Sequence, residues 1–363
     1  MNKILQQDLD KPWGLEFSQE EIEIIKAKNG LLSLELELSR KCNLRCIYCY
    51  AASGEALNNE LSFNQICDVV KQAKDLGAKK IIVLGGGEPL LYPQLLELIE
   101  FINKNQLDIA LFTNATLLTK KIAQKLYEFN VEVAIKLNSF RAPVQDLLAG
   151  KKNTFSLIMK GLKNLIQAGY PDKNHKLGVE TIICKQNYEE IPKIWRWARK
   201  NSITPYIEIM TLQGRAKKHP ELEVSKEEIR ALFETLARID NVEFNRYWLV
   251  HPPLVASHCA RHEYSCTVAA NGDVYPCPGV DIAVGNVRHL PLKTILKNSP
   301  IIQDLRNIRK NIKGKCAKCE LKYRCYGCRG HAYQVTGDYL AQDPLCWIDQ
   351  KNIKKDNEDK NKY

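Results

Sequence analysis

The sequence predicts an α/β fold with a parallel sheet, followed by a smaller second domain. Three observations carry this prediction. From residue 31 onward, short apolar runs alternate with segments whose apolar residues recur at helical spacing. The alternation repeats about six times, which is typical of a parallel sheet with right-handed crossovers but falls short of a closed eight-fold barrel. From residue 258 onward the alternation stops and cysteines become dense.

The elements are expected in a simple order along the chain. Residues 19–27 are expected to form a helix in a short lead-in, and residues 31–38 alternate apolar and polar side chains as a strand does. Ser62 is suited to cap a helix that Gly77 ends. Further strands are expected near residues 81–84, 108–112, 131–137, 178–184 and 205–210, and further helices near residues 94–104, 120–129, 154–168, 191–201 and 225–239.

Composition favours an ordinary globular protein of the cytoplasm. The 363 residues are 45% hydrophobic and 26% charged, with no apolar run long enough for a membrane span and no evident secretory signal. Thirteen cysteines in a chain of this size indicate metal or redox chemistry rather than a disulfide scaffold. The formal net charge of +11 overstates the positive charge, because cysteines that bind clusters do so as thiolates. A basic surface can still attract an acidic peptide or an anionic cofactor.

The first functional motif lies in the loop after the first predicted strand. Cys42, Cys46 and Cys49 have the spacing C-x3-C-x2-C, which provides three thiolates where an ordinary iron–sulfur site uses four. One iron is therefore left open for a small molecule. After the second predicted strand, residues 85–89 read Gly-Gly-Gly-Glu-Pro. The glycines allow close approach of a ligand, and the carboxylate can accept a hydrogen bond from an ammonium group.

Together, these two motifs resemble those of the radical S-adenosylmethionine (SAM) enzymes. The resemblance implies a partial (β/α)6 TIM-like barrel, a 4Fe–4S cluster on the three cysteines, and SAM on the open iron. It also implies a 5′-deoxyadenosyl radical that removes hydrogen from the substrate, and a flavodoxin or ferredoxin-type electron donor. Many members have Ser-x-Asp-Gly where residues 137–140 read Leu-Asn-Ser-Phe. The SAM contacts implied by the resemblance are Tyr48, Gly86, Gly87, Glu88, Asn114, Asn138, Ser139 and Thr181.

Eight further cysteines follow residue 258, enough for two clusters with four thiolates each. Residues 272–277 have the spacing G-x4-C and residues 316–325 the spacing C-x2-C-x5-C, which resembles the SPASM extension of peptide- and protein-modifying radical SAM enzymes. The next interval, from Cys325 to Cys328, is one residue shorter than usual. The resemblance implies an inner cluster on Cys259, Cys266, Cys277 and Cys328, and an outer cluster on Cys316, Cys319, Cys325 and Cys346.

Zinc is the alternative metal for these cysteines. Two Cys-x2-Cys knuckles suggest a zinc ribbon, but only five residues separate them, and a ribbon would leave the other cysteines unexplained. His258 and His262 flank Cys259 and are expected to support the site rather than bind its metal. The predicted organisation is a lead-in at 1–30, a radical SAM barrel at 31–215, a connector at 216–255, a SPASM domain at 256–349 and a basic tail at 350–363.

The target of hydrogen abstraction is not specified by these motifs. The leading hypothesis is oxidative modification of a ribosomally made peptide, such as a C–C or C–S crosslink, with a separate leader-recognition protein. Side-chain modification of a heme-pathway tetrapyrrole is the alternative, and a metal-binding RNA module is favoured only by charge. Formylglycine formation is not expected, because Pro278 stands where sulfatase-maturing relatives have an acid. Candidates for the catalytic base are Asp273, Tyr275 and Asp281.

Overall fold

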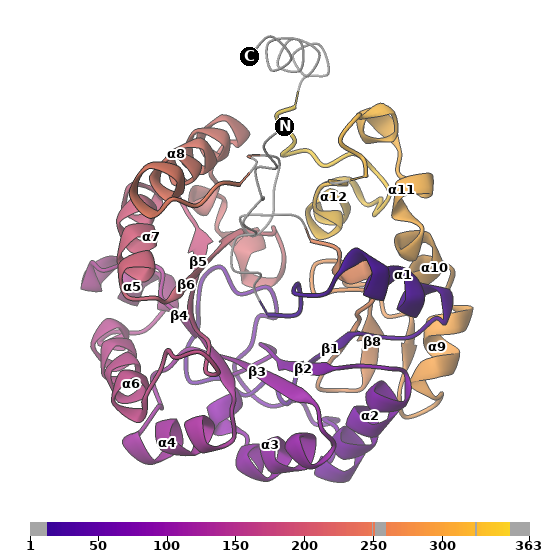
Figure 1. The fold of residues 1–363 in the computed structure, drawn as a ribbon, viewed down its shortest axis with the longest axis horizontal. Coiled ribbons are helices and arrows are strands. Elements are labelled where there is room, and N and C mark those ends of the chain that lie inside the picture. The colour runs from indigo at the N-terminus through magenta and orange to yellow at the C-terminus, as the bar shows by residue number, and fades with distance from the viewer. Residues whose placement is uncertain (1–12, 249, 251–258, 324, 349–363) are drawn as a thin grey trace.

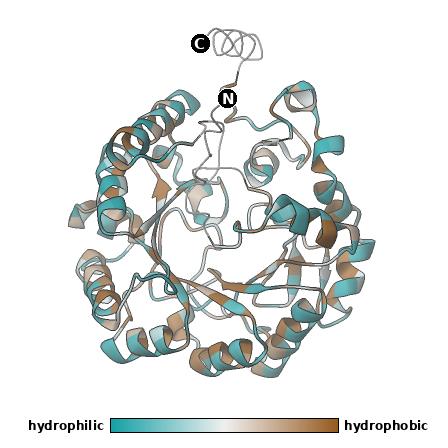
Figure 2. Ribbon diagram, in the orientation of Figure 1, coloured by the Kyte–Doolittle hydropathy of each residue, from teal (hydrophilic) through white to brown (hydrophobic). Residues whose placement is uncertain are grey.

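The computed structural model describes residues 13–248, 250, 259–323 and 325–348. A nine-stranded sheet of order β6-β5-β4-β3-β2-β1-β7-β8-β9 curves into a partial barrel, with helices around its outside (Figure 1). The helices turn their hydrophobic faces toward the sheet and their hydrophilic faces outward (Figure 2). Within the described part of the chain, no helix has both the length and the apolar character needed to cross a bilayer.

The first six strands are parallel and form the barrel, which confirms the predicted fold class. They are β1 (Ser33–Leu36), β2 (Lys80–Val83), β3 (Asp108–Thr113), β4 (Glu132–Lys136), β5 (Leu177–Ile183) and β6 (Thr204–Ile209). The helices of this part are α1 (Gln19–Ala27), α2 (Phe63–Asp75), α3 (Leu95–Lys104), α4 (Lys120–Glu128), α5 (Ala142–Ala149), α6 (Thr154–Ala168), α7 (Ile191–Lys200) and α8 (Lys226–Phe244).

The cysteine-rich region continues the same sheet. Strand β7 (Thr267–Val268) pairs in parallel with β1, and β8 (Asp273–Tyr275) and β9 (Gly285–Asn286) follow as an antiparallel hairpin. The remaining helices are α9 (Leu292–Asn298), α10 (Pro300–Arg306), α11 (Ile308–Asn311) and α12 (Arg329–Thr336). Short 3₁₀ turns are η1 (Pro89–Leu91), η2 (Tyr188–Glu190), η3 (Gly214–Lys218), η4 (Pro220–Leu222), η5 (Arg261–Glu263) and η6 (Gly314–Lys318).

Local sequence explains where the helices begin. The Ser62 hydroxyl oxygen accepts a hydrogen bond from the Gln65 N–H, and the Gln65 side-chain oxygen accepts one from the Ser62 N–H, so α2 starts with a complete capping box. Ser225 starts α8 in the same way. Helix α8 runs five residues beyond the predicted end at residue 239 and packs its apolar face on α7. Part of the predicted connector therefore belongs to the wall of the barrel.

Strand β1 departs from the simple meaning of its alternating pattern. Both of its faces are buried, including the polar face formed by Ser33, Glu35 and the following Glu37. In a barrel the polar face points inward, where Glu35 pairs with Arg261 at 2.9 Å. The alternation therefore marks a strand with a polar interior side rather than a solvent-exposed one.

An aromatic plug closes the barrel interior near the start of β5. The indole of Trp13 packs edge-on against Phe112 and Tyr206. A Cβ atom at Gly178 would overlap the Trp13 ring, so only glycine at this point of β5 lets the plug enter. The opposite, carboxyl-terminal ends of the strands remain available for a site, as is usual for α/β barrels.

Candidate active site

One cavity of about 300 Å³ lies at the carboxyl ends of the barrel strands and is walled by both parts of the chain. The barrel contributes the three-cysteine loop, the glycine turn after β2 and the end of β3, while the cysteine-rich region contributes the segments around residues 259, 277 and 328. The predicted site residues in its wall are Cys42, Cys46, Tyr48, Cys49, Gly86, Gly87, Glu88, Asn114, Cys259, Cys277 and Cys328.

Backbone hydrogen bonds to α5 hold the three-cysteine loop in place. The N–H groups of Arg45 and Ile47 donate to the carbonyls of Ala149 and Leu148 at 3.1 and 3.0 Å. Helix α5 was not predicted, although its Pro at the second helical position is a typical helix-start signal. Burial raises the pKa of the Cys46 thiol to about 12, so a metal that binds this thiol as a thiolate must displace its proton.

Arg215 is a second anchor of the same loop. Its guanidinium donates to the carbonyls of Cys46 and Ser53, both at 2.8 Å, and its backbone N–H donates to the Cys49 carbonyl at 2.9 Å. Arg215 belongs to the Gly-Arg-Ala segment at residues 214–216, which begins five residues after the end of the last barrel strand. The first and last segments of the barrel thus meet at the cavity, and this anchor was not predicted from the sequence.

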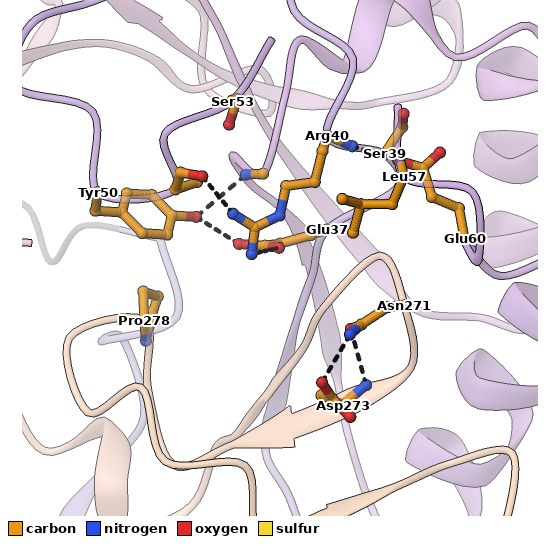
Figure 3. A network of polar contacts seen from close by, with 12 residues as sticks. Glu37, Ser39, Arg40, Tyr50, Ser53, Leu57, Glu60, Asn271, Asp273 and Pro278 are labelled. Atoms are coloured by element: carbon orange, nitrogen blue, oxygen red, sulfur yellow. Dashed lines mark hydrogen bonds and ion pairs between the residues drawn. The ribbon is translucent and has the colours of Figure 1, made fainter. Parts of the chain in front are cut away.

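The glycine turn after β2 packs directly on the cysteine loop. The Tyr50 hydroxyl donates to a Glu37 carboxylate oxygen at 2.8 Å and accepts from the Gly86 N–H at 3.2 Å, and Arg40 pairs with Glu37 at 3.2 Å (Figure 3). Gly86 has a φ of 69°, and a Cβ on Gly87 would overlap the Lys41 carbonyl. Glycine is therefore needed here both for conformation and for space.

Glu88 follows the turn and organises the end of β3. Its carboxylate accepts from the Thr113 hydroxyl at 2.6 Å, the Asn114 N–H at 2.8 Å and the Leu90 N–H at 3.1 Å. Burial raises the pKa of this carboxyl. Glu88 lies in the cavity wall, as expected. Its oxygens already accept hydrogen bonds from three groups of the protein, so in this structure Glu88 positions the residues around it.

Three expected SAM contacts, Asn138, Ser139 and Thr181, are fully buried and do not line the cavity. The Asn138 amide donates to the Tyr48 hydroxyl at 2.7 Å, and the Thr181 hydroxyl donates to the Leu137 carbonyl at 2.6 Å. The Ser139 hydroxyl is hydrogen-bonded to Glu190. These polar groups are used to tie β4 and β5 to their neighbours, and Asn138 reaches the cavity only through Tyr48.

Charged residues on the inward faces of β4, β5 and β6 complete the barrel side of the cavity and were not predicted. Lys136 forms an ion pair with Glu180, and Glu208 lies beside them in the wall. Burial, followed by the Glu180 charge, raises the pKa of Glu208 to about 8. Each residue interrupts an apolar strand sequence. A charged residue within an apolar strand could have indicated these cavity residues, because a charge in a buried strand has to face a polar interior.

The inner cysteines come together only in part. Cys259, Cys277 and Cys328 line the cavity, whereas Cys266 lies in the hydrophobic core with no exposed surface. Four side chains of the same wall have buried nitrogen or oxygen atoms without a hydrogen-bond partner among the described residues. They are Arg261 (Nε), His262 (Nδ1), Tyr326 (hydroxyl) and Arg329 (Nε and Nη2).

These observations fit an iron–sulfur cluster at the inner site. Thiols supply the ligands that iron prefers, and the unpaired donors of Arg261, Tyr326 and Arg329 can hydrogen-bond to cluster sulfur. Buried donors are rarely left unpaired in a folded protein. The wall between Cys259 and Arg329 is therefore built to surround a group that accepts hydrogen bonds.

The outer cysteines form a separate, compact site. Cys316, Cys319, Cys325 and Cys346 line one small cavity of about 20 Å³. The Gly327 N–H donates to the Cys325 sulfur at 3.4 Å, a contact that stabilises a thiolate. Four thiols around one small space fit a closed four-thiolate cluster.

The candidate catalytic bases do not line the cavity. Asp273 accepts from the Asn271 amide at 2.7 Å and holds the β8–β9 hairpin (Figure 3). Asp281 is exposed and accepts from Gln334 at 2.7 Å, while Tyr275 is half-buried outside the cavity wall. Their predicted role in proton transfer is not supported by their position.

Pro278 does line the cavity, and its carbonyl accepts from Gln213 at 2.9 Å. His258 and the basic tail lie outside the described residues.

Comparison with known proteins assigns the two parts of the chain. The family model of the radical SAM superfamily matches residues 36–198, and that of the SPASM iron–sulfur cluster-binding domain matches residues 259–320. The AdoMet-dependent heme synthase of Methanosarcina barkeri is 28% identical over 89% of this chain and 98% of its own. The mycofactocin maturase MftC of Mycolicibacterium smegmatis is 27% identical over 87% of this chain and 82% of its own.

Solved structures share the fold at lower identity. SuiB of Streptococcus suis bound to its precursor peptide SuiA superposes with a TM-score of 0.70 at 19% identity, over 91% of this chain and 80% of that chain. The structure of anSMEcpe with bound AdoMet and the Cp18Cys peptide gives a TM-score of 0.66 at 16% identity, over 86% and 93%. The two domains bind 4Fe–4S clusters and SAM. The chain is therefore a radical SAM enzyme with a C-terminal SPASM domain.

Proposed function

We propose that this enzyme carries out a net two-electron oxidation of a substrate held in the cavity between its two domains. The observation that carries the proposal is that one cavity is walled by both the three-cysteine loop and Cys259, Cys277 and Cys328. When bound, SAM and the clusters supply a radical that takes one hydrogen atom and an acceptor for one further electron. The substrate also gives up one proton, which balances the oxidation.

The residues of the chain have distinct roles in this proposal. Cys42, Cys46 and Cys49 hold the first cluster, and the glycine turn at residues 85–87 gives SAM close access to the backbone. Arg215 holds the cysteine loop against the segment that follows the last barrel strand, through hydrogen bonds to the carbonyls of Cys46 and Ser53. Glu208 is the proposed proton carrier, because a carboxyl with a pKa of about 8 exchanges its proton near neutral pH.

We infer that the substrate is a ribosomally made peptide. The mycofactocin maturase relative supports this class, and SuiB, which has the same fold, holds a precursor peptide. The proposal includes a flavodoxin or ferredoxin-type electron donor and a separate protein that presents the leader of the peptide. The cysteine roles, the inner and outer cluster assignment, and a total of three clusters belong to the same proposal.

A tetrapyrrole is the second candidate substrate. The observation that favours it is the match to a heme synthase over nearly the full length of both proteins. The two candidates predict different products from one assay. A peptide crosslink removes two hydrogens from the peptide mass, whereas side-chain modification of a porphyrin changes the porphyrin mass and spectrum.

The test uses the full chain, reconstituted anaerobically and supplied with SAM and a reductant. One arm receives peptides made from the short open reading frames that flank the gene, and the other receives a propionate-bearing porphyrin. We expect 5′-deoxyadenosine to form in step with a peptide lighter by two hydrogens. Product only in the porphyrin arm would replace the peptide by the second candidate. Turnover in both arms without net oxidation of either substrate would overturn the oxidative proposal. The Cys42/Cys46/Cys49 triple alanine variant is the control for both arms.

A further inference from the structure

The inner cluster site has three thiols in the cavity wall, where a closed four-iron cluster needs four ligands. Cys259, Cys277 and Cys328 provide the three. Cys266 is the remaining cysteine of the predicted inner set, but its side chain lies in the hydrophobic core with 0% exposure. Another residue must complete the site, or one iron stays open.

The direction of the Cys266 side chain follows from the sheet. The Cys266 carbonyl accepts from the Glu35 N–H at 3.0 Å, which fixes its backbone to β1. The next residue, Thr267, points to the interior of the barrel, where its hydroxyl donates to Glu35 at 2.7 Å. Because side chains alternate along a strand, Cys266 points to the opposite face, among the helices. Moving its sulfur into the cavity would require a shift in the register of β7.

His262 lies just before β7 and, unlike Cys266, lines the cavity. It belongs to the 3₁₀ turn η5, between Cys259 and β7, and its side chain lines the cavity with only 6% exposure. Its Nδ1 atom is buried and has no hydrogen-bond partner among the described residues. The neighbouring side chains in the turn are already engaged, since Arg261 pairs with Glu35 and Glu263 pairs with Lys26 and Arg309. His262 therefore brings an unpartnered imidazole nitrogen into the same cavity wall as the three thiols, and imidazole is a ligand that iron–sulfur centres accept.

We propose that Nδ1 of His262 is the fourth ligand of the inner cluster, in place of Cys266. The assignment depends on the presence of the inner cluster and not on which substrate the enzyme uses. A neutral imidazole in place of a thiolate removes one negative charge from the cluster and raises its reduction potential. A cluster so ligated accepts an electron more readily, which suits a position beside the substrate cavity.

The test looks at the cluster itself by pulsed EPR. The background is the Cys42/Cys46/Cys49 triple alanine variant, which removes the SAM-binding cluster and leaves the SPASM clusters. The protein is labelled with ¹⁵N-histidine, reconstituted, reduced and examined for a ¹⁵N coupling to a cluster. We expect a directly coupled histidine nitrogen in this background, and its loss in His262→Cys with about four irons still present at the inner site. His262→Cys should also lower the potential of that cluster.

Two further variants decide between the ligands. Cys266→Ala should keep both the iron content and the ¹⁵N coupling, as should Cys67→Ala, which removes a core thiol of α2 that does not line the cavity. Loss of about four irons in Cys266→Ala, with no histidine coupling in the parent, would overturn the proposal in favour of the cysteine. A full iron content in every variant without any ¹⁵N coupling would also overturn it, and would leave a three-thiolate cluster with an open iron. Iron content verifies the inner cluster separately, so none of these outcomes depends on turnover.

Discussion

Two cysteine-lined cavities among the described residues differ in size and in the number of thiols around them. The larger, at about 300 Å³, is walled by thiols in groups of three and by buried donors without partners among the described residues. The smaller, at about 20 Å³, is walled by four thiols and by Leu321, Gly327 and Ile348. The three barrel cysteines leave one iron position free for a small molecule, and the unpaired donors leave hydrogen bonds available, whereas the four outer thiols leave no ligand position open. The number of thiols in each group therefore predicts whether its cluster can bind a further molecule.

The largest effect is expected from replacing the three cysteines of the loop after β1, which leave one iron position free for SAM. In the Cys42/Cys46/Cys49 triple alanine variant, about four of roughly twelve irons should be lost and SAM cleavage should fall to background. The reason is that no other cysteine in the described cavity wall lies on the barrel side. Iron analysis and 5′-deoxyadenosine formation measure the two effects. Residual SAM cleavage near the parent rate would show that the three-cysteine loop is not the SAM-binding site.

Removing thiols from the outer site should lower product formation while leaving SAM cleavage nearly unchanged. The Cys319→Ala/Cys346→Ala variant removes two of the four outer thiols and should lose about four irons. SAM cleavage should stay within about threefold of the parent rate, because the cavity around the barrel is intact, while product per 5′-deoxyadenosine falls. A parallel loss of both quantities would mean that the outer site supports the fold instead of the electron transfer.

A smaller loss should come from adding one methyl group where the glycine turn meets the cysteine loop. In Gly87→Ala, the new Cβ overlaps the Lys41 carbonyl, so the turn and the loop must move apart. SAM affinity should fall roughly tenfold to a hundredfold, corresponding to about 1.4 to 2.8 kcal/mol. Equilibrium binding of SAM to the reconstituted protein measures this effect. Gly337→Ala is the matched control, since a Cβ at that left-handed position has nothing within 4 Å and should leave SAM binding unchanged.

The last expected effect is on the pH dependence of stability rather than on SAM binding or cleavage. The folded protein holds a proton on Glu208 up to a pH of about 8, whereas an ordinary carboxyl in the unfolded chain releases it near 4.5. The folded state therefore binds more protons across this window, so stability falls as the pH rises from about 4.5 to about 8. Glu208→Gln should remove that fall and be more stable than the parent at pH 8, with little difference at pH 4.5. Denaturant unfolding of the cofactor-free protein measures it. The exposed Glu189→Gln should keep the slope of the parent, and an unchanged slope in Glu208→Gln would contradict the assignment.

The sequence predicted the fold better than the cavity. The barrel strands lie within two residues of their predicted limits, because each is a short apolar run between clear helix signals. Helix α5 was missed because it is only eight residues long and directly follows a loop. The cysteine spacings placed ten of the eleven predicted ligands in one of the two cavity walls, since a motif is a local feature.

The remaining parts of the cavity depend on tertiary structure. Lys136, Glu180 and Glu208 come from three strands, and only the curvature of the sheet turns them toward one space. Asn138 and Thr181 carry the right chemistry for a ligand, but they are used to satisfy buried backbone and hydroxyl groups. The side of the sheet on which Cys266 lies is set by the register of β7 with β1, which cysteine spacing does not encode.

The pairing of β7 with β1 has a consequence for biosynthesis. The backbone N–H groups of Leu32, Glu35 and Glu37 donate to carbonyls between Tyr264 and Val268, so one edge of the first strand stays unpaired until those residues leave the ribosome. At typical rates of translation this takes roughly 10 to 50 s after β1 itself emerges. An exposed strand edge is prone to pair with other chains. The nascent enzyme should therefore depend on chaperone protection during that interval, and slow codons between the two strands should lower the yield of protein able to accept its clusters.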